Sequence, residues 1–276
     1  MKIICIIQAR TTSTRLPNKV LLDLKGKTIL QHIIERVEKS ELIDKVVIAT
    51  TINETDDKIE ELCKNLGVDY FRGSENNVLS RYYECAKKYN PDYVIRVTSD
   101  CPCIDYKVLN KLIIKHLDEN NDYTSNSLER SFPHGLDCEI FSFKLLEEAN
   151  MNAIDNFEKE HVTPYMYRTR KDLKISQLIY DKDYSKIRIT VDTKEDYELM
   201  TVLYDYLYLE DSYFDTEDII DFFNKRPYLS KLNNNIVQKK VCVNLEEELN
   251  EALNLLERQD LSKAKDFLIQ KIKENK

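Results

Sequence analysis

Three cations stand close together near the N-terminus, in a loop where they could hold a chain of phosphates. Arg10, Arg15 and Lys19 follow a short apolar run, residues 3–7, and are interleaved with serine and threonine. Guanidinium groups grip phosphate oxygens in pairs, and a lysine ammonium acts as a point charge. The loop contains no glycine, so it is neither a P-loop nor a dinucleotide-binding turn. The pattern indicates a polyphosphate site, and a solvated basic loop fits it about as well.

Two aspartates follow predicted strands elsewhere in the chain. Asp100 comes after an apolar run at 93–98, and Asp192 comes after one at 187–191. Ligands of open α/β sheets bind beyond the carboxyl ends of the strands, so both carboxylates should lie near the basic loop. Mg²⁺ prefers such oxygen ligands, together with phosphates and water. The alternative for each aspartate is to cap the next helix, but their combination with the loop favours a metal site.

Strands and helices alternate in the part of the chain that must place these residues. Apolar runs typical of buried strands occupy 2–7, 45–50, 68–71 and 93–98. Apolar residues at helical spacing occupy 28–39, 56–66, 78–89 and 108–119. This alternation predicts βαβ units and a mostly parallel sheet. The second half is less regular, with strands expected at 122–126, 139–142 and 174–179 and helices at 143–150, 157–167, 194–206 and 216–225. The helix at 157–167 should be interrupted or end near Pro164.

Composition bounds the function and the domain organisation. The 276 residues carry a net charge of −8, which disfavours nonspecific binding to nucleic acid or anionic membranes. Seven scattered cysteines suit reduced thiols in the cytoplasm, and the first apolar run is too short to span a membrane. We expect a main domain over 1–230, a linker over 231–241 and a helical C-terminal extension over 242–276.

A resemblance becomes specific in the segment IIQARTTSTRLPNKVLLDLKGKTILQHIIERV, residues 6–37. It is similar to the nucleotide-binding start of the sugar cytidylyltransferases, which include CMP-KDO synthetases, acylneuraminate cytidylyltransferases and the spore-coat polysaccharide biosynthesis protein F branch. Further segments agree in order, among them FRGSENNVLSRYYECA, YVIRVTSDCPCID, FPHGLDCEIFS, EKEHVTPYMY and ITVDTKEDYE. The resemblance covers roughly residues 1–230 and leaves the C-terminal extension outside.

The resemblance implies a Rossmann-like mixed, mostly parallel sheet of the nucleotide-diphospho-sugar transferase type. It implies Mg²⁺-dependent transfer of a nucleoside monophosphate from CTP, or another NTP, to a sugar or sugar acid, with release of pyrophosphate. Such products would serve surface polysaccharide or glycan synthesis. It also implies a homodimer, with residues near 132–167 at or near the interface.

The resemblance implies roles for individual residues as well. Arg10, Arg15, Lys19 and Asp100 would form the catalytic group, and Asp100 with Asp192 would hold Mg²⁺. Residues implied to line the nucleotide are Gln8, Ala9, Arg10, Arg15, Lys19, Arg72, Gly73, Ser74 and Thr98. Thr98 stands where CMP-KDO synthetases carry glutamine, so the choice of base stays open.

Acceptor-binding candidates lie in two later segments. His134, Asp137 and Glu139 supply polar groups around Gly135, and on an extended segment the two carboxylates would share one face. The alternative is a charged edge strand. His161 could bond to the acceptor, cap a helix or pack within the fold.

Two other functions stay open from the residues alone. A glycosyltransferase that uses a nucleotide sugar usually carries an Asp-x-Asp motif after a strand. Here Asp100 is followed by Cys101 and Pro102, and the next aspartate is Asp105. A non-catalytic nucleotide-binding scaffold would make the helical extension the working part. The intact cations and aspartates argue against that scaffold.

Overall fold

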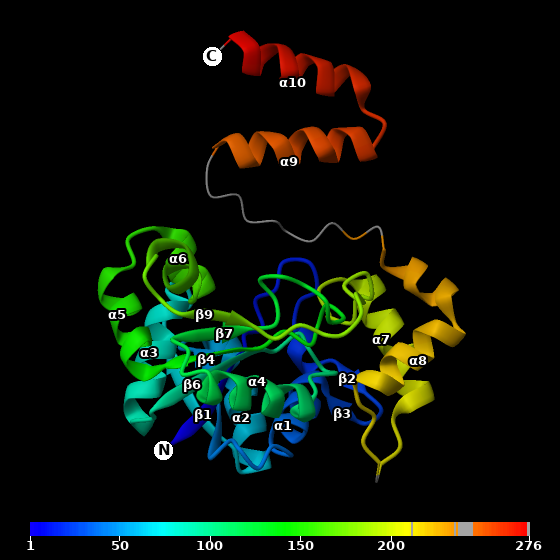
Figure 1. Ribbon diagram of the computed structural model, residues 1–276. Helices are drawn as coiled ribbons and strands as arrows, with labels where there is room; N and C mark the ends of the chain where they lie inside the picture. The colour runs from blue at the N-terminus through cyan, green and yellow to red at the C-terminus, as the bar shows by residue number, and fades with distance from the viewer. Residues whose placement is uncertain (211, 235, 237–244, 275–276) are drawn as a thin grey trace. The chain divides into compact units, whose positions relative to one another are not determined.

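The computed structural model describes residues 1–210, 212–234, 236 and 245–274 (Figure 1). The chain divides into two compact units, Met1–Asn235 and Ile236–Lys276. The first unit holds the sheet, and the second holds a pair of helices. Within the described ranges, no helix is long and apolar enough to cross a bilayer.

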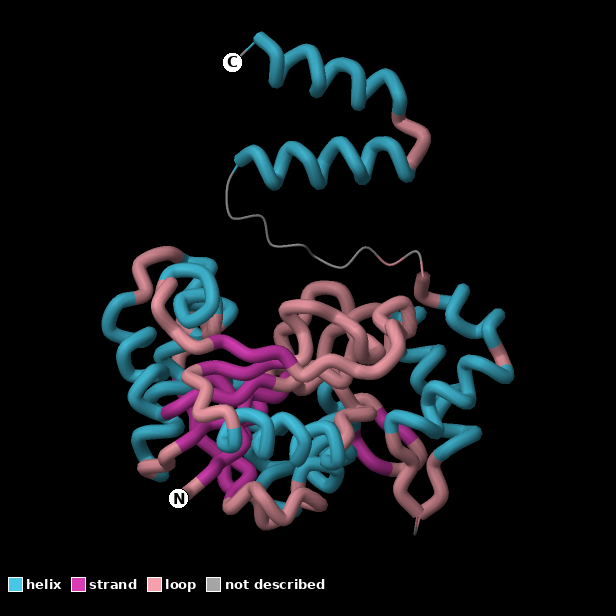
Figure 2. The backbone as a smooth tube through the Cα atoms, in the orientation of Figure 1, coloured by secondary structure: helices cyan, strands magenta, loops and turns pink. Residues whose placement is uncertain are grey.

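A seven-stranded mixed sheet forms the centre of the first unit (Figure 2). In order across the sheet, the strands are β5 (Asp69–Gly73), β4 (Lys45–Thr51), β1 (Ile3–Gln8), β6 (Tyr93–Thr98), β8 (Glu139–Ser142), β7 (Tyr123–Ser125) and β9 (Ile175–Gln177). The first four strands are parallel, β8 is antiparallel to both of its neighbours, and β9 is parallel to β7. The predicted mixed, mostly parallel sheet is confirmed.

Helices cover both faces of this sheet, because side chains alternate along each buried strand. In β1, Ile3, Cys5 and Ile7 face one core, and Ile4 and Ile6 face the other. The helices over the first core are α1 (Ile29–Val37), α2 (Asp57–Leu66), α4 (Tyr106–Asp118), α7 (Lys194–Leu207) and α8 (Thr216–Lys225). Those over the second core are α3 (Val78–Tyr89), α5 (Phe143–Asn152) and α6 (Asn156–His161), with the short π-helix η3 (Tyr165–Thr169).

One strand prediction is wrong. The segment 187–191 forms a single bridge, between Arg188 and His134, instead of a ladder. His134 accepts from the N–H of Ile189, but the chain around it turns at Gly135, whose φ is +118°. A turning partner presents no row of backbone groups, so pairing cannot extend along the segment. The interruption predicted near Pro164 in the helix expected at 157–167 is confirmed, because the segment forms α6 and, after Pro164, η3.

Several short elements were not predicted. They are the two-stranded hairpin of β2 (Asp23–Leu24) and β3 (Lys27–Thr28) and the 3₁₀ turns η1 (Lys19–Leu21), η2 (Glu54–Asp56) and η4 (Pro227–Leu232). The second unit contains α9 (Leu245–Arg258) and α10 (Ser262–Glu274). The predicted linker overlaps the end of η4, and residues 235 and 237–241 of it, like Cys242, lie outside the described residues.

Candidate active site

The carboxyl ends of β1, β4 and β6 meet at one edge of the sheet. Gln8, the last residue of β1, is in register with Thr98 at the end of β6 and with Ala49 in β4. The basic loop leaves β1 at this edge and returns through η1. The sheet therefore brings the loop and the segment after β6 together, as the strand pattern predicts.

A buried carboxylate fixes the start of the basic loop. Asp56 is fully buried and accepts hydrogen bonds from the Thr11 backbone N–H at 2.8 Å and from its hydroxyl at 2.6 Å. The Thr51 hydroxyl, at the end of β4, donates to the same carboxylate. Asp56 thus ties the loop to the neighbouring strand. It was not predicted as a site residue, because its partner is distant in sequence.

Lys19 lies between the two predicted metal ligands. Its Nζ is 3.1 Å from Asp100 Oδ2 and 2.8 Å from Asp192 Oδ1. Arg15 adds a second cation, with Nη2 3.2 Å from Asp192 Oδ2. Burial alone would lower the Lys19 pKa, but the two carboxylate charges outweigh it, so that pKa is raised. Burial would raise the Asp100 pKa, but Lys19 and the Thr98 hydroxyl hold it well below its usual value.

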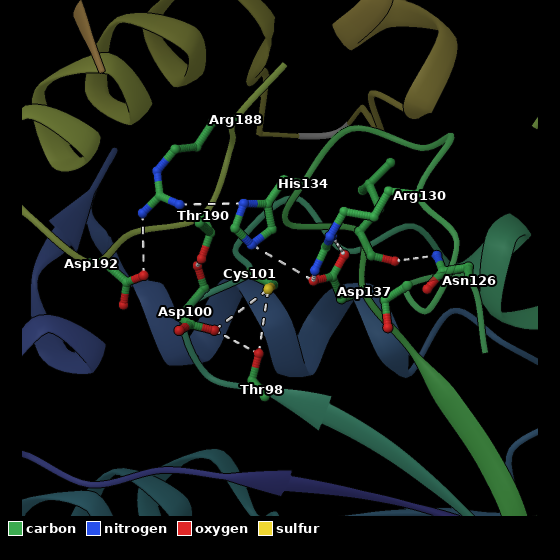
Figure 3. A network of polar contacts seen from close by, with 12 residues as sticks. Thr98, Asp100, Cys101, Asn126, Arg130, His134, Asp137, Arg188, Thr190 and Asp192 are labelled. Atoms are coloured by element: carbon green, nitrogen blue, oxygen red, sulfur yellow. Dashed lines mark hydrogen bonds and ion pairs between the residues drawn. The ribbon is translucent and has the colours of Figure 1, made fainter. Parts of the chain in front are cut away.

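Main-chain contacts join the two aspartate segments. The Val191 N–H donates to the Asp100 carbonyl at 2.8 Å. The Thr190 hydroxyl, which Figure 3 shows beside Asp100, donates to the same carbonyl at 3.1 Å. Asp192 is the next residue after this contact. The spacing of the two carboxylates is therefore set by the backbone.

Neither aspartate caps a helix, so the capping alternative is wrong. Asp105 is the N-cap of α4, and Thr193 is the N-cap of α7. Among the described residues, no group of three or more His, Cys, Asp or Glu could hold a metal ion. Two carboxylates still suit Mg²⁺, because it commonly takes one or two from protein and the rest from phosphates and water. The donor set of Asp100 and Asp192 thus fits a metal that arrives with a nucleotide.

A second buried carboxylate positions Asp192. Asp196 accepts from Arg188 Nε and Nη2, both at 2.8 Å, and from the Asp192 N–H at 3.0 Å. Arg188 Nη2 is also 3.2 Å from Asp192 Oδ2. Burial would raise the Asp196 pKa, but Arg188 outweighs it, so that pKa is lowered. Neither Arg188 nor Asp196 was predicted, although their spacing of four residues from Asp192 was visible.

The first acceptor candidates lie beside this pair. Figure 3 shows a chain of contacts that runs from Asp192 through Arg188 and His134 to Asp137 and Arg130. The His134 ring is 3.3 Å from Arg188 Nη1 and 3.7 Å from Asp137 Oδ2. Arg130 binds both oxygens of Asp137, at 2.7 and 2.8 Å. Burial lowers the His134 pKa.

Glu139 belongs to a different network from Asp137. Its carboxylate pairs with Arg96 Nη1 at 2.6 Å and accepts from the Thr163 hydroxyl at 2.8 Å and from the Tyr123 hydroxyl. The two carboxylates therefore bind different partners, although Leu136, Cys138 and Ile140, which alternate with them, all face the first core as the predicted alternation requires. His161 ends α6 and packs against Phe157, with 4.7 Å between ring centroids. Its pKa is lowered by burial.

A family model described as cytidylyltransferase matches residues 4–266. The chain belongs to the cytidylyltransferase family. It is therefore a nucleotidyltransferase.

Relatives of similar length support this membership. The uncharacterized protein MJ1063 of Methanocaldococcus jannaschii is 42% identical over 87% of this chain and 97% of its own length. Spore coat polysaccharide biosynthesis protein SpsF of Bacillus subtilis is 36% identical over 73% of this chain and 86% of its own length. A solved cytidylyltransferase structure from Leptospira borgpetersenii is 36% identical, with a TM-score of 0.80 over 87% of this chain and all of that one.

The residues expected to line the nucleotide differ in their surroundings: some lie near the aspartates at the sheet edge, and others are paired elsewhere in the fold. Thr98 lies at the sheet edge and donates to Asp100 Oδ1 at 2.6 Å. Arg72 forms ion pairs with α2, because its Nη1 is 2.7 Å from both Asp57 and Glu60. Gly73 and Ser74 follow it, and Ala9 and Arg10 follow Gln8 at the start of the loop. The half-exposed Arg10 lies 3.7 Å from Glu75.

Proposed function

We propose that the chain transfers CMP from CTP to a sugar or sugar acid, with Mg²⁺ as cofactor and release of pyrophosphate. The observation that carries the proposal is the joint contact of Lys19 with Asp100 and Asp192, at the edge where the basic loop leaves β1. Cations can bind the phosphates of a triphosphate, and neighbouring carboxylates can bind the metal ion that accompanies it. Family membership supports CTP as the donor.

The residues would act through charge and position. Transfer requires an acceptor oxygen to attack the α-phosphorus in line with departing pyrophosphate. Arg10, Arg15 and Lys19 would neutralise phosphate oxygens in the transition state, where their stabilisation counts most. Asp100 and Asp192 would hold the Mg²⁺, which would supply positive charge to offset the negative charge of the phosphates. No covalent nucleophile on the enzyme is needed.

The amide of Gln8 is our candidate for contact with the base. Its Oε1 is buried, and within the described part of the chain it has no hydrogen-bond partner. A buried acceptor without a donor is costly, and the amino group of cytosine would supply one. The register with Thr98 places Gln8 on the neighbouring strand at the same level.

The acceptor would bind on the side of His134 and Asp137. This network reaches Asp192 through Arg188, so an acceptor held there would be close to the transferred phosphorus. Its arginines and histidine suit an anionic sugar such as a sugar acid. Glu139 and His161 would form a second, separate part of the acceptor site. The name of the Bacillus relative, spore coat polysaccharide biosynthesis protein SpsF, supports a product used in the synthesis of a surface polysaccharide. A homodimer and a cytoplasmic location stay predictions.

The test is pyrophosphate release with Mg²⁺, each of the four NTPs, and a panel of sugar acids and sugar phosphates. We expect release with CTP and one class of sugar acid. Asp100→Asn and Lys19→Ala should each lower the rate about a hundredfold or more. Lys27→Ala, which removes an ammonium paired with Glu35, is the matched control. Unchanged release in the first two variants would refute the proposal.

A further inference from the structure

The Lys19 ammonium occupies the space between two carboxylates whose spacing is set by other parts of the chain. Asp100 and Asp192 are joined by the backbone contact of Val191, and Asp192 is held further by Arg188. Of the described cations, Lys19 alone bonds to both aspartates. Its side chain is only 12% exposed. A cation is thus already seated where the proposed metal would bind.

We propose that Lys19 holds the place of the divalent metal until a nucleotide arrives, so that metal and nucleotide bind in a coupled way. The inference rests on the proposed function, because it takes Asp100 and Asp192 as the metal ligands. A divalent metal that binds without nucleotide must displace the Lys19 ammonium from the two carboxylates. The ammonium then lies close to the metal's two positive charges. A triphosphate removes this conflict, because its oxygens accept Lys19 and share the metal.

The coupling has a physical basis in charge alone. Opposite charges in contact at a partly buried site attract strongly, and like charges at the same distance repel as strongly. Lys19 therefore lowers the affinity of the two carboxylates for a second cation. Thermodynamic reciprocity requires that whatever draws Lys19 away raises metal affinity, and that the metal in turn favours the nucleotide.

The test measures Mn²⁺ binding without nucleotide, by electron paramagnetic resonance, as a stand-in for Mg²⁺. Lys19→Gln should bind Mn²⁺ about tenfold more tightly than the wild type, which corresponds to about 1.4 kcal/mol. Lys19→Arg keeps a cation and should stay as weak as the wild type. Lys27→Gln, at the ion pair with Glu35, should also leave Mn²⁺ affinity unchanged.

Two further measurements locate the effect. Adding Asp192→Asn to Lys19→Gln should abolish the gain in affinity. Mg²⁺ alone should raise the unfolding temperature of Lys19→Gln more than that of the wild type, because stabilisation grows with the ratio of metal concentration to Kd. If Lys19→Gln does not fold, the same measurements are made on Lys19→Met. Methionine is uncharged, and its side chain is similar in length to that of lysine.

Equal Mn²⁺ affinity of the folded wild type and Lys19→Gln would overturn the inference. A gain that survives Asp192→Asn would overturn it too, because the metal would then bind elsewhere. These outcomes are separate from failure of the proposed function. Wild-type pyrophosphate release with equal Mn²⁺ affinities would refute only the placeholder role. No release with any NTP would refute the function itself.

Discussion

Removing the Asp196 carboxylate should destabilise the protein strongly, although this side chain makes no contact with substrate in the proposed mechanism. Asp196 is fully buried and accepts from Arg188, from the backbone N–H groups of Asp192 and Thr193, and from Asn233 Nδ2 at 2.9 Å. Asp196→Ala leaves the Arg188 guanidinium with one carboxylate, Asp192 at 3.2 Å, and the His134 ring at 3.3 Å. Breaking a buried ion pair costs about 3 to 5 kcal/mol, and losing the bond from the N–H of the N-cap Thr193 to Asp196 costs up to about 1.

Since Arg188 keeps one carboxylate partner, we expect the lower end of that range, a loss of about 3 to 4 kcal/mol in unfolding free energy. Urea denaturation followed by near-UV circular dichroism of the tyrosines would measure it. Glu198→Ala is the control on the same helix. Its pair with Lys194 is 3.6 Å long and exposed, so it should cost under about 0.5 kcal/mol. A loss below about 1 kcal/mol for Asp196→Ala would refute the reasoning.

Three other perturbations test separate parts of the fold. Gly135→Ala would place a Cβ 2.7 Å from the Ile189 carbonyl at a φ of +118°, so it should cost more than about 2 kcal/mol; an unchanged melting temperature would contradict the close approach. Burial lowers the pKa of His116 to about 4 from 6.5, so the unfolded state takes up the proton first. Stability should be complete above about pH 6.5 and fall by up to about 3 kcal/mol towards about pH 4, and His116→Phe should lack this slope in urea titrations. Asp56→Asn weakens the anchor of Thr11 and should lower CTP affinity about five- to tenfold by calorimetry; equal affinity would show that the loop needs no such anchor.

The regular part of the fold could be predicted because its signals are local. The strand β6, the helix α3 and the strand β8 have the bounds that their apolar patterns indicate. Strand order was inaccessible to such patterns, because pairing joins residues far apart. The extended segment before Asp192 has the alternation of a strand, but its neighbour turns at Gly135 and leaves it a single bridge.

The residues of the candidate site likewise fall into those that the sequence could identify and those that it could not. Lys19 and Asp100 could be named because they follow the ends of β1 and β6, and Asp192 because it follows an extended segment with the alternation of a strand. Asp56 and Asp196 could not, because their roles depend on partners that only the folded chain brings near. The different partners of Asp137 and Glu139, Arg130 and Arg96, likewise come from separate parts of the chain.

The main-chain link from Val191 to the Asp100 carbonyl has a consequence for how substitutions act. Because backbone groups hold the two segments together, replacing either carboxylate should leave the distance between the segments unchanged while changing the charge of the site. The site is preorganised: the conformational entropy of assembling it is lost during folding, not during each binding event. To change donor specificity, one could therefore substitute side chains at this edge of the sheet. The distance between the two backbone segments should stay the same in such variants.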